Sequence, residues 1–391
     1  MSTRTHPRVG PLAAGAPAPR PLDVDRLLDD PATQIIVCCG SGGVGKTTTS
    51  AALALRAAER GRKVVVLTID PARRLAQSMG IEALDNTPRP VPGVQGEGSL
   101  DAMMLDMKST FDEVVLSQAT PEKAAQILEN PFYVALSTSF AGTQEYMAME
   151  KLGQLHASAR ESGRWDLIVV DTPPSRSALD FLDAPERLSS FLDGRFIRLL
   201  LTPARGPAKL MSAGFGLMTH ALTKIVGASV LRDLQTFVAA FDTLFGGFRA
   251  RATATYELLQ AQGTAFLVIA APEPDALREA AYFVERLSEE RMPLAGLVVN
   301  RASSQPEGQL SAEAALAAAE RLDPEADALT VGLLRLHADR RRIVAREGRL
   351  RAGFARSHPA VATAVVPALA TDVHDLSGLR TVGGLLADTV D

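Results

Sequence analysis

Gly40-Ser41-Gly42-Gly43-Val44-Gly45-Lys46-Thr47-Thr48 is the stretch that decides the fold of this chain. It follows an apolar run, residues 35–39, and precedes a run rich in helix formers that ends near residue 58. In a glycine-rich loop between a strand and a helix, backbone N–H groups can wrap around a phosphate, and the helix N-terminus adds positive charge. The sequence therefore predicts a phosphate-binding loop after the first strand.

The side chains of this loop have separate tasks. The Lys46 ammonium would reach the β- and γ-phosphates of a nucleotide, and the Thr47 hydroxyl would contact a magnesium ion. The alternative is a glycine-rich turn that binds nothing. The predicted nucleotide-binding set in this stretch is Gly42, Gly43, Val44, Gly45, Lys46, Thr47 and Thr48.

Composition is that of an ordinary globular protein. The 391 residues are 46% apolar and 22% charged, and the net charge of −4 gives no positive excess for nucleic acid. Cys38 and Cys39 are neighbours in the first strand, so they form no ordinary disulfide with each other and lack metal-binding spacing. No segment has the ~18–20 apolar residues of a membrane span, and the N-terminus lacks a signal-peptide pattern. We expect a cytoplasmic protein without a nucleic-acid partner or stable membrane insertion, whose residues 1–22 form a disordered tail.

Polar residues stand at the carboxyl ends of further predicted strands. Asp70 follows the β-branched run of residues 63–68, and Asp171 and Asn300 end apolar runs in the same way. Ligands of doubly wound sheets bind outside these strand ends. We therefore expect Asp70 near the nucleotide and Asp171 in a Walker B arrangement that orients magnesium. The alternatives are that Asp70 caps the next helix and that Asn300 starts a turn.

Two long helical stretches interrupt the strand pattern. The first, at about residues 109–160, follows a third predicted strand at 102–106, and the second lies at about 183–262. We predict an α/β fold, a doubly wound and mostly parallel P-loop NTPase sheet with an inserted α-helical subdomain, in a single domain over residues 23–391. The apolar positions of residues 196–226 either pack in the core of the insertion or form a groove for an apolar partner.

Taken in order, these motifs resemble the ArsA family of ATPases, which holds the arsenite-pump ATPase and the ATPase that targets tail-anchored membrane proteins. The resemblance runs from about residue 35 to the C-terminal helix. It is closest to the actinobacterial ArsA-like ATPases that occur as paired paralogues. The loop resembles the family's deviant phosphate loop, and residues 68–72 resemble its first switch. Residues 171–174, followed by residues 179–182, resemble its second switch. Residues 142–145 resemble a short motif of the family's first insertion.

The resemblance implies an ATPase with ATP and Mg²⁺ as cofactors. It assigns Asp70 to the attacking water, beside Lys46 as the second catalytic residue, and Asp171 to magnesium. It also assigns Asn300 to adenine, with Pro367 and the following loop covering the base. Two subunits of the family close on ATP and open after hydrolysis. In the targeting ATPase the helical insertions form a groove for the hydrophobic helix of a membrane-protein client.

The chain departs from the family at Ser41. The family has a signature lysine there, which reaches across a dimer to the partner's nucleotide. A hydroxyl supplies no positive charge to the transition state. We therefore expect either a slow homodimer or a heterodimer with a paralogue that keeps the lysine. The metalloid-binding and zinc-binding cysteines of family members also have no counterpart, because Cys38 and Cys39 lie in the first strand. This argues against an arsenite pump.

Two other function classes share parts of this pattern. A regulatory or partitioning switch of the ParA/MinD kind uses the same nucleotide chemistry, and the cluster Arg340-Arg341-Arg342 would suit a basic surface. MinD-like proteins add a basic amphipathic C-terminal helix, whereas residues 376–391 end in acidic residues. An iron–sulfur reductase is excluded because no suitable cysteines are present to hold a cluster.

Overall fold

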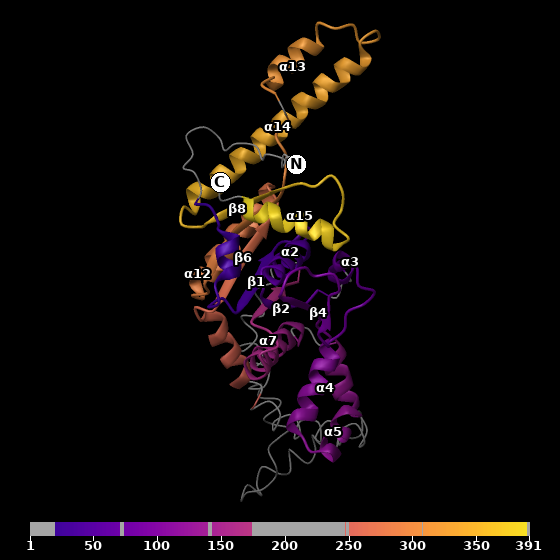
Figure 1. Ribbon diagram of the computed structural model, residues 1–391, viewed down its shortest axis with the longest axis vertical. Coiled ribbons are helices and arrows are strands. Elements are labelled where there is room, and N and C mark those ends of the chain that lie inside the picture. Colours follow the sequence, from indigo (N-terminus) through magenta and orange to yellow (C-terminus); the bar gives the residue numbers. More distant parts are fainter. Residues whose placement is uncertain are drawn as a thin grey trace, which may run out of the picture. The chain divides into compact units, whose positions relative to one another are not determined.

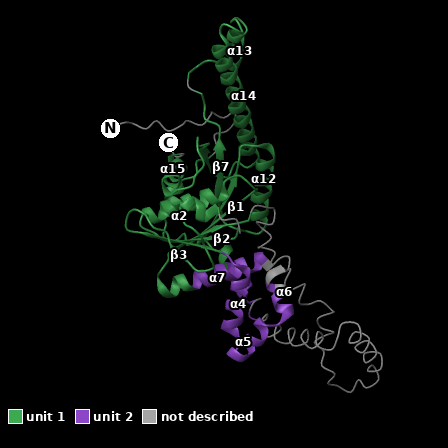
Figure 2. Cartoon of the chain, turned by 90° about the vertical axis from the view of Figure 1, so that its right-hand side faces the viewer, with its two compact units in different colours: residues 1–104, 158–179, 258–391 green, residues 105–157, 180–257 purple. Residues whose placement is uncertain are grey.

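The chain forms two compact units. The structure is a computed structural model that describes residues 20–70, 74–139, 143–173, 247, 250–306 and 308–388. Unit 1 comprises residues 1–104, 158–179 and 258–391, and unit 2 comprises residues 105–157 and 180–257 (Figure 2).

Unit 1 is built on a sheet whose described strands have the order β3-β4-β2-β5-β1-β6-β7-β8 (Figure 1). Neighbouring strands pair in parallel, except that β3 is antiparallel to β4. Every residue of β1, β5 and β6 is buried, as expected for a parallel sheet covered on both faces. This confirms the predicted α/β class. The strands are β1 (Ile35–Gly40), β2 (Lys63–Thr68), β3 (Arg89–Pro90), β4 (Ser99–Met104), β5 (Leu167–Asp171), β6 (Thr264–Ala270), β7 (Leu294–Ala302) and β8 (Thr363–Pro367).

Helices cover both faces of this sheet (Figure 2). Helix α2 packs on β1, β2 and β5 with α15 beside it, and α12 packs on β1, β6 and β7. Helices α13 and α14 pack against each other as a hairpin. The helices of unit 1 are α1 (Val24–Asp29), α2 (Lys46–Glu59), α3 (Arg74–Met79), α12 (Pro274–Glu289), α13 (Ala312–Ala319), α14 (Ala328–Ser357) and α15 (Leu376–Ala387).

The described part of unit 2 is helical. Polar contacts join its helices, and one of them is the 2.6 Å hydrogen bond from the Tyr133 hydroxyl to Asp112. Another joins Arg251 to the buried Glu150 carboxylate at 2.9 Å. The apolar stretch of residues 196–226, the predicted client groove, lies outside the described residues. The named helices are α4 (Met107–Gln118), α5 (Pro121–Leu128), α6 (Pro131–Ser139) and α7 (Thr143–Ser162), and residues 250–260 are also helical.

Two boundaries differ from the sequence-based expectations. The third strand is β4 at residues 99–104 rather than 102–106, because it pairs along the whole length of β2. The predicted tail of residues 1–22 is too long at its end. Pro21 bridges to Thr363, and the buried Leu22 donates its backbone N–H to the Thr363 carbonyl oxygen at 3.2 Å. The chain therefore joins the edge of the sheet before residue 23.

Candidate functional site

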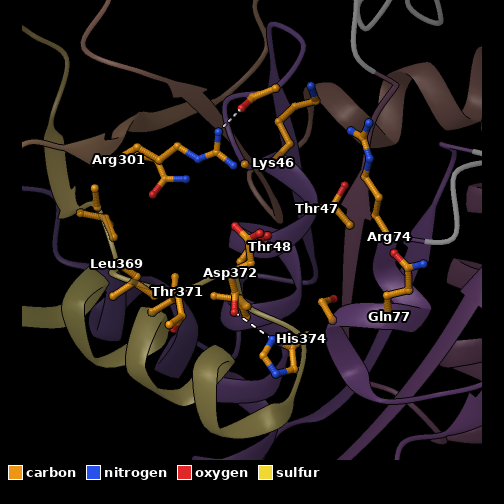
Figure 3. Close-up of a pocket in the computed structure, with 18 of the residues that line it drawn as sticks. Lys46, Thr47, Thr48, Arg74, Gln77, Arg301, Leu369, Thr371, Asp372 and His374 are labelled. Atoms are coloured by element: carbon orange, nitrogen blue, oxygen red, sulfur yellow. Dashed lines mark hydrogen bonds between the residues drawn. The ribbon is translucent and has the colours of Figure 1, made fainter.

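A cavity of about 920 Å³ opens at the carboxyl ends of the unit 1 strands, beside the start of α2 (Figure 3). This is the edge at which ligands bind in doubly wound sheets. Residues from four distant parts of the sequence meet here. Those that the sequence predicted are Gly43, Gly45, Lys46, Thr47, Thr48, Asp70, Asn300 and Pro367.

Glycine is required at two points of the loop. Gly40 has φ 149°, and a Cβ added there would lie 2.1 Å from the Ile269 carbonyl oxygen. Gly45 has φ 90°, and a Cβ there would lie 2.3 Å from Asn300 Nδ2. A side chain at either position would meet both a disfavoured backbone conformation and a steric clash.

Lys46 is buried at the start of α2. Its Nζ donates a 2.7 Å hydrogen bond to the Ser41 carbonyl oxygen, so the side chain folds back along its own loop. Burial lowers the pKa of Lys46, and the negative charges of Asp171 and Asp70 oppose that effect. A phosphate in the cavity would offer this ammonium group a charged partner in place of a neutral carbonyl.

Asp171 lies fully buried at the end of β5. Its Oδ2 accepts a 2.9 Å hydrogen bond from the Thr68 hydroxyl, whereas no described residue meets hydrogen-bond geometry at Oδ1. Burial raises the pKa of Asp171 to about 6, against the stabilising effects of the Thr47 and Thr68 hydroxyls and the Lys46 ammonium. A carboxylate oxygen without a donor, close to a threonine hydroxyl, suits a hard oxygen-seeking cation. The two side chains therefore fit Mg²⁺.

Asp70 follows the end of β2 next to this pair. The backbone N–H of Ile69 donates to the Asp171 carbonyl oxygen at 2.9 Å, which ties the ends of β2 and β5 together. Asp70 is largely buried and lines the cavity with Lys46 and Thr47. The last two residues of the predicted first switch, residues 71 and 72, lie outside the described residues, as do the second-switch residues from 174 onward.

The end of β7 contacts the phosphate loop directly. Asn300 Nδ2 donates to the Val44 carbonyl oxygen at 2.8 Å, and Arg301 Nη1 donates to the Gly43 carbonyl oxygen at 2.8 Å. Arg301 has a left-handed backbone with φ 59°, at an irregularity where β7 pairs with β8. Sequence reasoning missed Arg301, although an arginine directly after a strand-ending asparagine was a usable signal. Its guanidinium adds a cation to the cavity wall (Figure 3).

The opposite wall is the segment after β8. Pro367 is buried and followed by lining residues of this loop, and a 2.9 Å hydrogen bond between His374 Nδ1 and the Asp372 carbonyl oxygen shapes the loop (Figure 3). The segment thus forms one wall of the cavity. The further lining residues here are Ala368, Leu369, Thr371 and Val373.

The other side of the phosphate loop faces a second pocket, of about 360 Å³. Ser41 lies in its wall. Of the predicted set, Gly42 and Val44 line this pocket and not the larger cavity, and Gly43 lines both. Arg301, which was not predicted, also lines both. Its carboxylates are Glu273, Asp275, Glu279 and Glu347.

Cys38 and Cys39 are unsuited to metal or metalloid chemistry. Both are free and fully buried in β1. Burial raises the pKa of both thiols, that of Cys38 to about 12. A thiolate, which is the metal-binding form, is therefore strongly disfavoured at either position.

Comparison with known proteins gives a consistent result. The profile of the family described as anion-transporting ATPase matches residues 33–319. The chain is 30% identical over 173 residues to the ATPase GET3 of Malassezia globosa, and the aligned region covers 44% of this chain and 49% of that protein. It is 32% identical over 156 residues to the arsenical pump-driving ATPase of Acidiphilium multivorum, and the aligned region covers 39% of this chain and 26% of that protein. It is 28% identical over 176 residues to the ATPase ASNA1 homolog of Entamoeba dispar, and the aligned region covers 44% of this chain and 52% of that protein. The chain thus spans about half the length of the curated relatives it matches, or less.

Proposed function

The chain belongs to the anion-transporting ATPase family, which is the ArsA family of the sequence motifs, and on this premise we propose that it binds Mg-ATP and hydrolyses it. The observation that carries this proposal is the convergence of Lys46, Thr47, Asp70 and Asn300 on one cavity. Beside them lies the Asp171 carboxylate, whose Oδ1 has no hydrogen-bond partner among the described residues. These groups match the parts that phosphoryl transfer requires, namely charge neutralisation, a metal site and a carboxylate for water.

Each side chain has one task in the proposed reaction. Lys46 exchanges its bond to the Ser41 carbonyl for the β- and γ-phosphates. Thr47 and Asp171 hold Mg²⁺, which when bound neutralises charge on the phosphate oxygens. Asp70 orients the attacking water. Asn300 keeps its place through Val44 and presents its amide to the adenine.

The remaining parts of the proposal concern coupling. Closure and opening of two subunits would change the shape of the helical unit 2, which would bind a hydrophobic helix or membrane-protein client. Relatives named GET3 and ASNA1 homolog support an ATPase of this general type. None of the described helices is long and apolar enough to cross a membrane. Helix α15 is no candidate for a MinD-like membrane anchor either, because its Leu379, Val382 and Leu386 are buried in unit 1.

For the partner we propose a paralogue that carries the signature lysine. Ser41 provides no charge of its own, and the pocket beside it gathers four carboxylates that would attract an incoming ammonium group. The proposed complex is an asymmetric dimer in which the paralogue supplies the missing cation to this chain's nucleotide. The competing arrangement is a homodimer with slow turnover.

Nucleotide binding and turnover of the purified protein test the first part. We expect Lys46→Ala to lose binding of a fluorescent ATP analogue in Mg²⁺. Asp70→Asn should keep binding and lose hydrolysis. Lys63→Ala, a loss of the same charge at an exposed position away from the cavity, is the matched control and should change neither. Undiminished hydrolysis by Asp70→Asn would remove Asp70 from its proposed role.

The Asp70→Asn variant also tests the partner, because it should hold the closed, ATP-bound state. Co-purification in ATP and Mg²⁺ with a lysine-bearing paralogue, together with faster turnover of the wild-type mixture, supports the heterodimer. Recovery of apolar helices supports a client groove. An ATPase rate of the homodimer that no paralogue changes refutes the heterodimer, and recovery of DNA or lipid alone favours the ParA/MinD-like alternative.

A further inference from the structure

Helix α3 turns one face toward the nucleotide cavity. Arg74, Gln77 and Ser78 line the cavity, and steps of three and four residues place them on the same side of the helix. Leu75 and Met79 are buried, and α3 packs on α2 and α15. This packing fixes the position of the Arg74 backbone beside the cavity.

The Arg74 guanidinium has no partner in the part of the chain that the structure describes. It is exposed, and neither a hydrogen bond nor an ion pair links it to a described residue. By contrast, the guanidinium groups of Arg56, Arg60 and Arg62 in the same unit all pair with carboxylates. The donors of Arg74 are therefore available to a ligand in the cavity.

The side chain of Arg74 points toward the end of Lys46, and Leu369 and Thr371 lie across the cavity from it (Figure 3). Burial lowers the pKa of Lys46, and the positive charge of Arg74 lowers it further, whereas the negative charge of Asp70 opposes the effect. Two cations that face one cavity repel each other when it is empty. Around a ligand with several negative charges the same arrangement becomes favourable.

We propose that Arg74 binds the terminal phosphate of ATP and makes the site prefer ATP to ADP. This role rests on the proposed function, which puts the β- and γ-phosphates at Lys46 and the attacking water at Asp70. Arg74 lines the cavity with both residues and follows Asp70 by four positions.

The chemistry of the terminal phosphate suits an arginine that comes from outside the phosphate loop. Backbone N–H groups of such a loop enclose the inner phosphates, whereas the terminal phosphate is also met by groups from other elements. The planar guanidinium of Arg74 can donate two parallel hydrogen bonds to two oxygens of one phosphate. When hydrolysis removes that phosphate, Arg74 loses its partner and the affinity for the nucleotide falls.

This cation is distinct from the one that Ser41 does not provide. Ser41 lies in the wall of the second pocket, whereas Arg74 lines the larger cavity and not that pocket. Arg74 therefore selects the triphosphate within one chain. The cation of a partner would reach the nucleotide from the other side of the phosphate loop.

Competition with a fluorescent ADP analogue on the full chain in Mg²⁺ tests the assignment. The competitors are ADP and the non-hydrolysable β,γ-imido analogue of ATP. Arg74→Ala should weaken binding of the triphosphate by about tenfold or more and that of ADP by less than about twofold. Arg74→Lys should lie between Arg74→Ala and the wild type, because an ammonium group keeps the charge without the paired donors.

Two further variants guard the result. Arg89→Ala removes the same charge from an exposed ion pair with Asp85, on β3, and should change neither affinity. Arg74→Gln keeps the aliphatic stem and should behave like Arg74→Ala. Both Arg74 variants should melt at the wild-type temperature without nucleotide, because they remove no contact to a described residue.

Equal losses of affinity for the triphosphate and for ADP would overturn the assignment to the terminal phosphate. Unchanged affinities of both Arg74→Ala and Arg74→Gln would also overturn it. A wild type that binds neither nucleotide would overturn the proposed function as well. A preference for the triphosphate that Arg74→Ala retains would remove only the role of Arg74, so the two failures are distinguishable.

Discussion

Asn300 Nδ2 donates a 2.8 Å hydrogen bond to the Val44 carbonyl oxygen, and this bond ties the end of β7 to the phosphate loop across 256 residues of sequence. The same amide nitrogen occupies the space into which a Cβ at Gly45 would project, at 2.3 Å. The loop and the proposed base-recognising residue therefore depend on each other. A change in either one displaces the other.

Gly45→Ala tests this dependence. A left-handed backbone costs a non-glycine residue roughly 1–2 kcal/mol, and the clash with Asn300 adds to that cost. Since 1.4 kcal/mol is a factor of about ten, we expect nucleotide affinity to fall tenfold or more in a fluorescence titration. Gly61→Ala is the matched control, because Gly61 has φ 99° but open space around it. It should lose stability and keep its affinity, and equal affinity losses in both variants would refute a specific contact.

Asp171 predicts a pH dependence of stability in the absence of metal. Its pKa of about 6 in the folded protein lies above the ordinary value of 3.8, so the folded state keeps a proton that the unfolded chain releases in that window. The free energy of unfolding should therefore fall as pH rises from about 4 to 6, by about 3 kcal/mol in total.

The variant Asp171→Asn should lose this part of the pH dependence and be more stable than the wild type near neutral pH in EDTA. Urea unfolding at a series of pH values measures both effects. Mg²⁺ with nucleotide should reverse the order, because the cation stabilises the wild-type carboxylate alone. Parallel pH profiles of the two proteins in EDTA would show that Asp171 is not the group responsible.

Arg62 predicts a large local contribution to the stability of unit 1. Its guanidinium donates to the carbonyl oxygens of Leu28 and Thr33 at 2.8 Å each, and to Asp166 at 2.7 Å. Arg62→Ala should lower the free energy of unfolding by roughly 3 kcal/mol, because it leaves buried carbonyls without donors.

The exposed Arg60, which pairs with Asp29, is the control. Its replacement by alanine should cost less than about 1 kcal/mol, as for most surface ion pairs. Chemical denaturation of the two variants separates the values. Similar losses would mean that the buried hydrogen bonds of Arg62 contribute no more than a surface contact.

Local sequence determined the parts of the fold that were predicted correctly. The runs that became β1, β2 and β8 are continuous and β-branched, and the glycine-rich loop sits between a strand and a helix, so neighbouring residues suffice to identify them. The two residues of β3 form a strand only because β4 lies beside them, and nothing in the sequence around Arg89 and Pro90 marks that pairing.

Local sequence likewise predicted some residues of the site and not others. Lys46, Asp70 and Asp171 each follow or end a recognisable strand, so position along the chain indicated the nucleotide edge. The left-handed backbone of Arg301 and the acidic pocket were not predictable, because the pocket joins Glu273 before α12 to Glu347 on α14. Such residues meet only after the sheet and its helices have been assembled.

Ser41→Lys is the most direct test of what this chain lacks. The new ammonium would stand beside the pocket that Glu279 and Glu347 line, and would restore the family's cation at the phosphate loop. We expect the variant to hydrolyse ATP as a homodimer at least about tenfold faster than the wild type, since a cation at the transition state is worth ~10²–10³ or more in comparable sites. Ser41→Ala is the control and should match the wild-type rate. If Ser41→Lys stays as slow as Ser41→Ala while a lysine-bearing paralogue accelerates the wild type, the partner must supply more than this one charge.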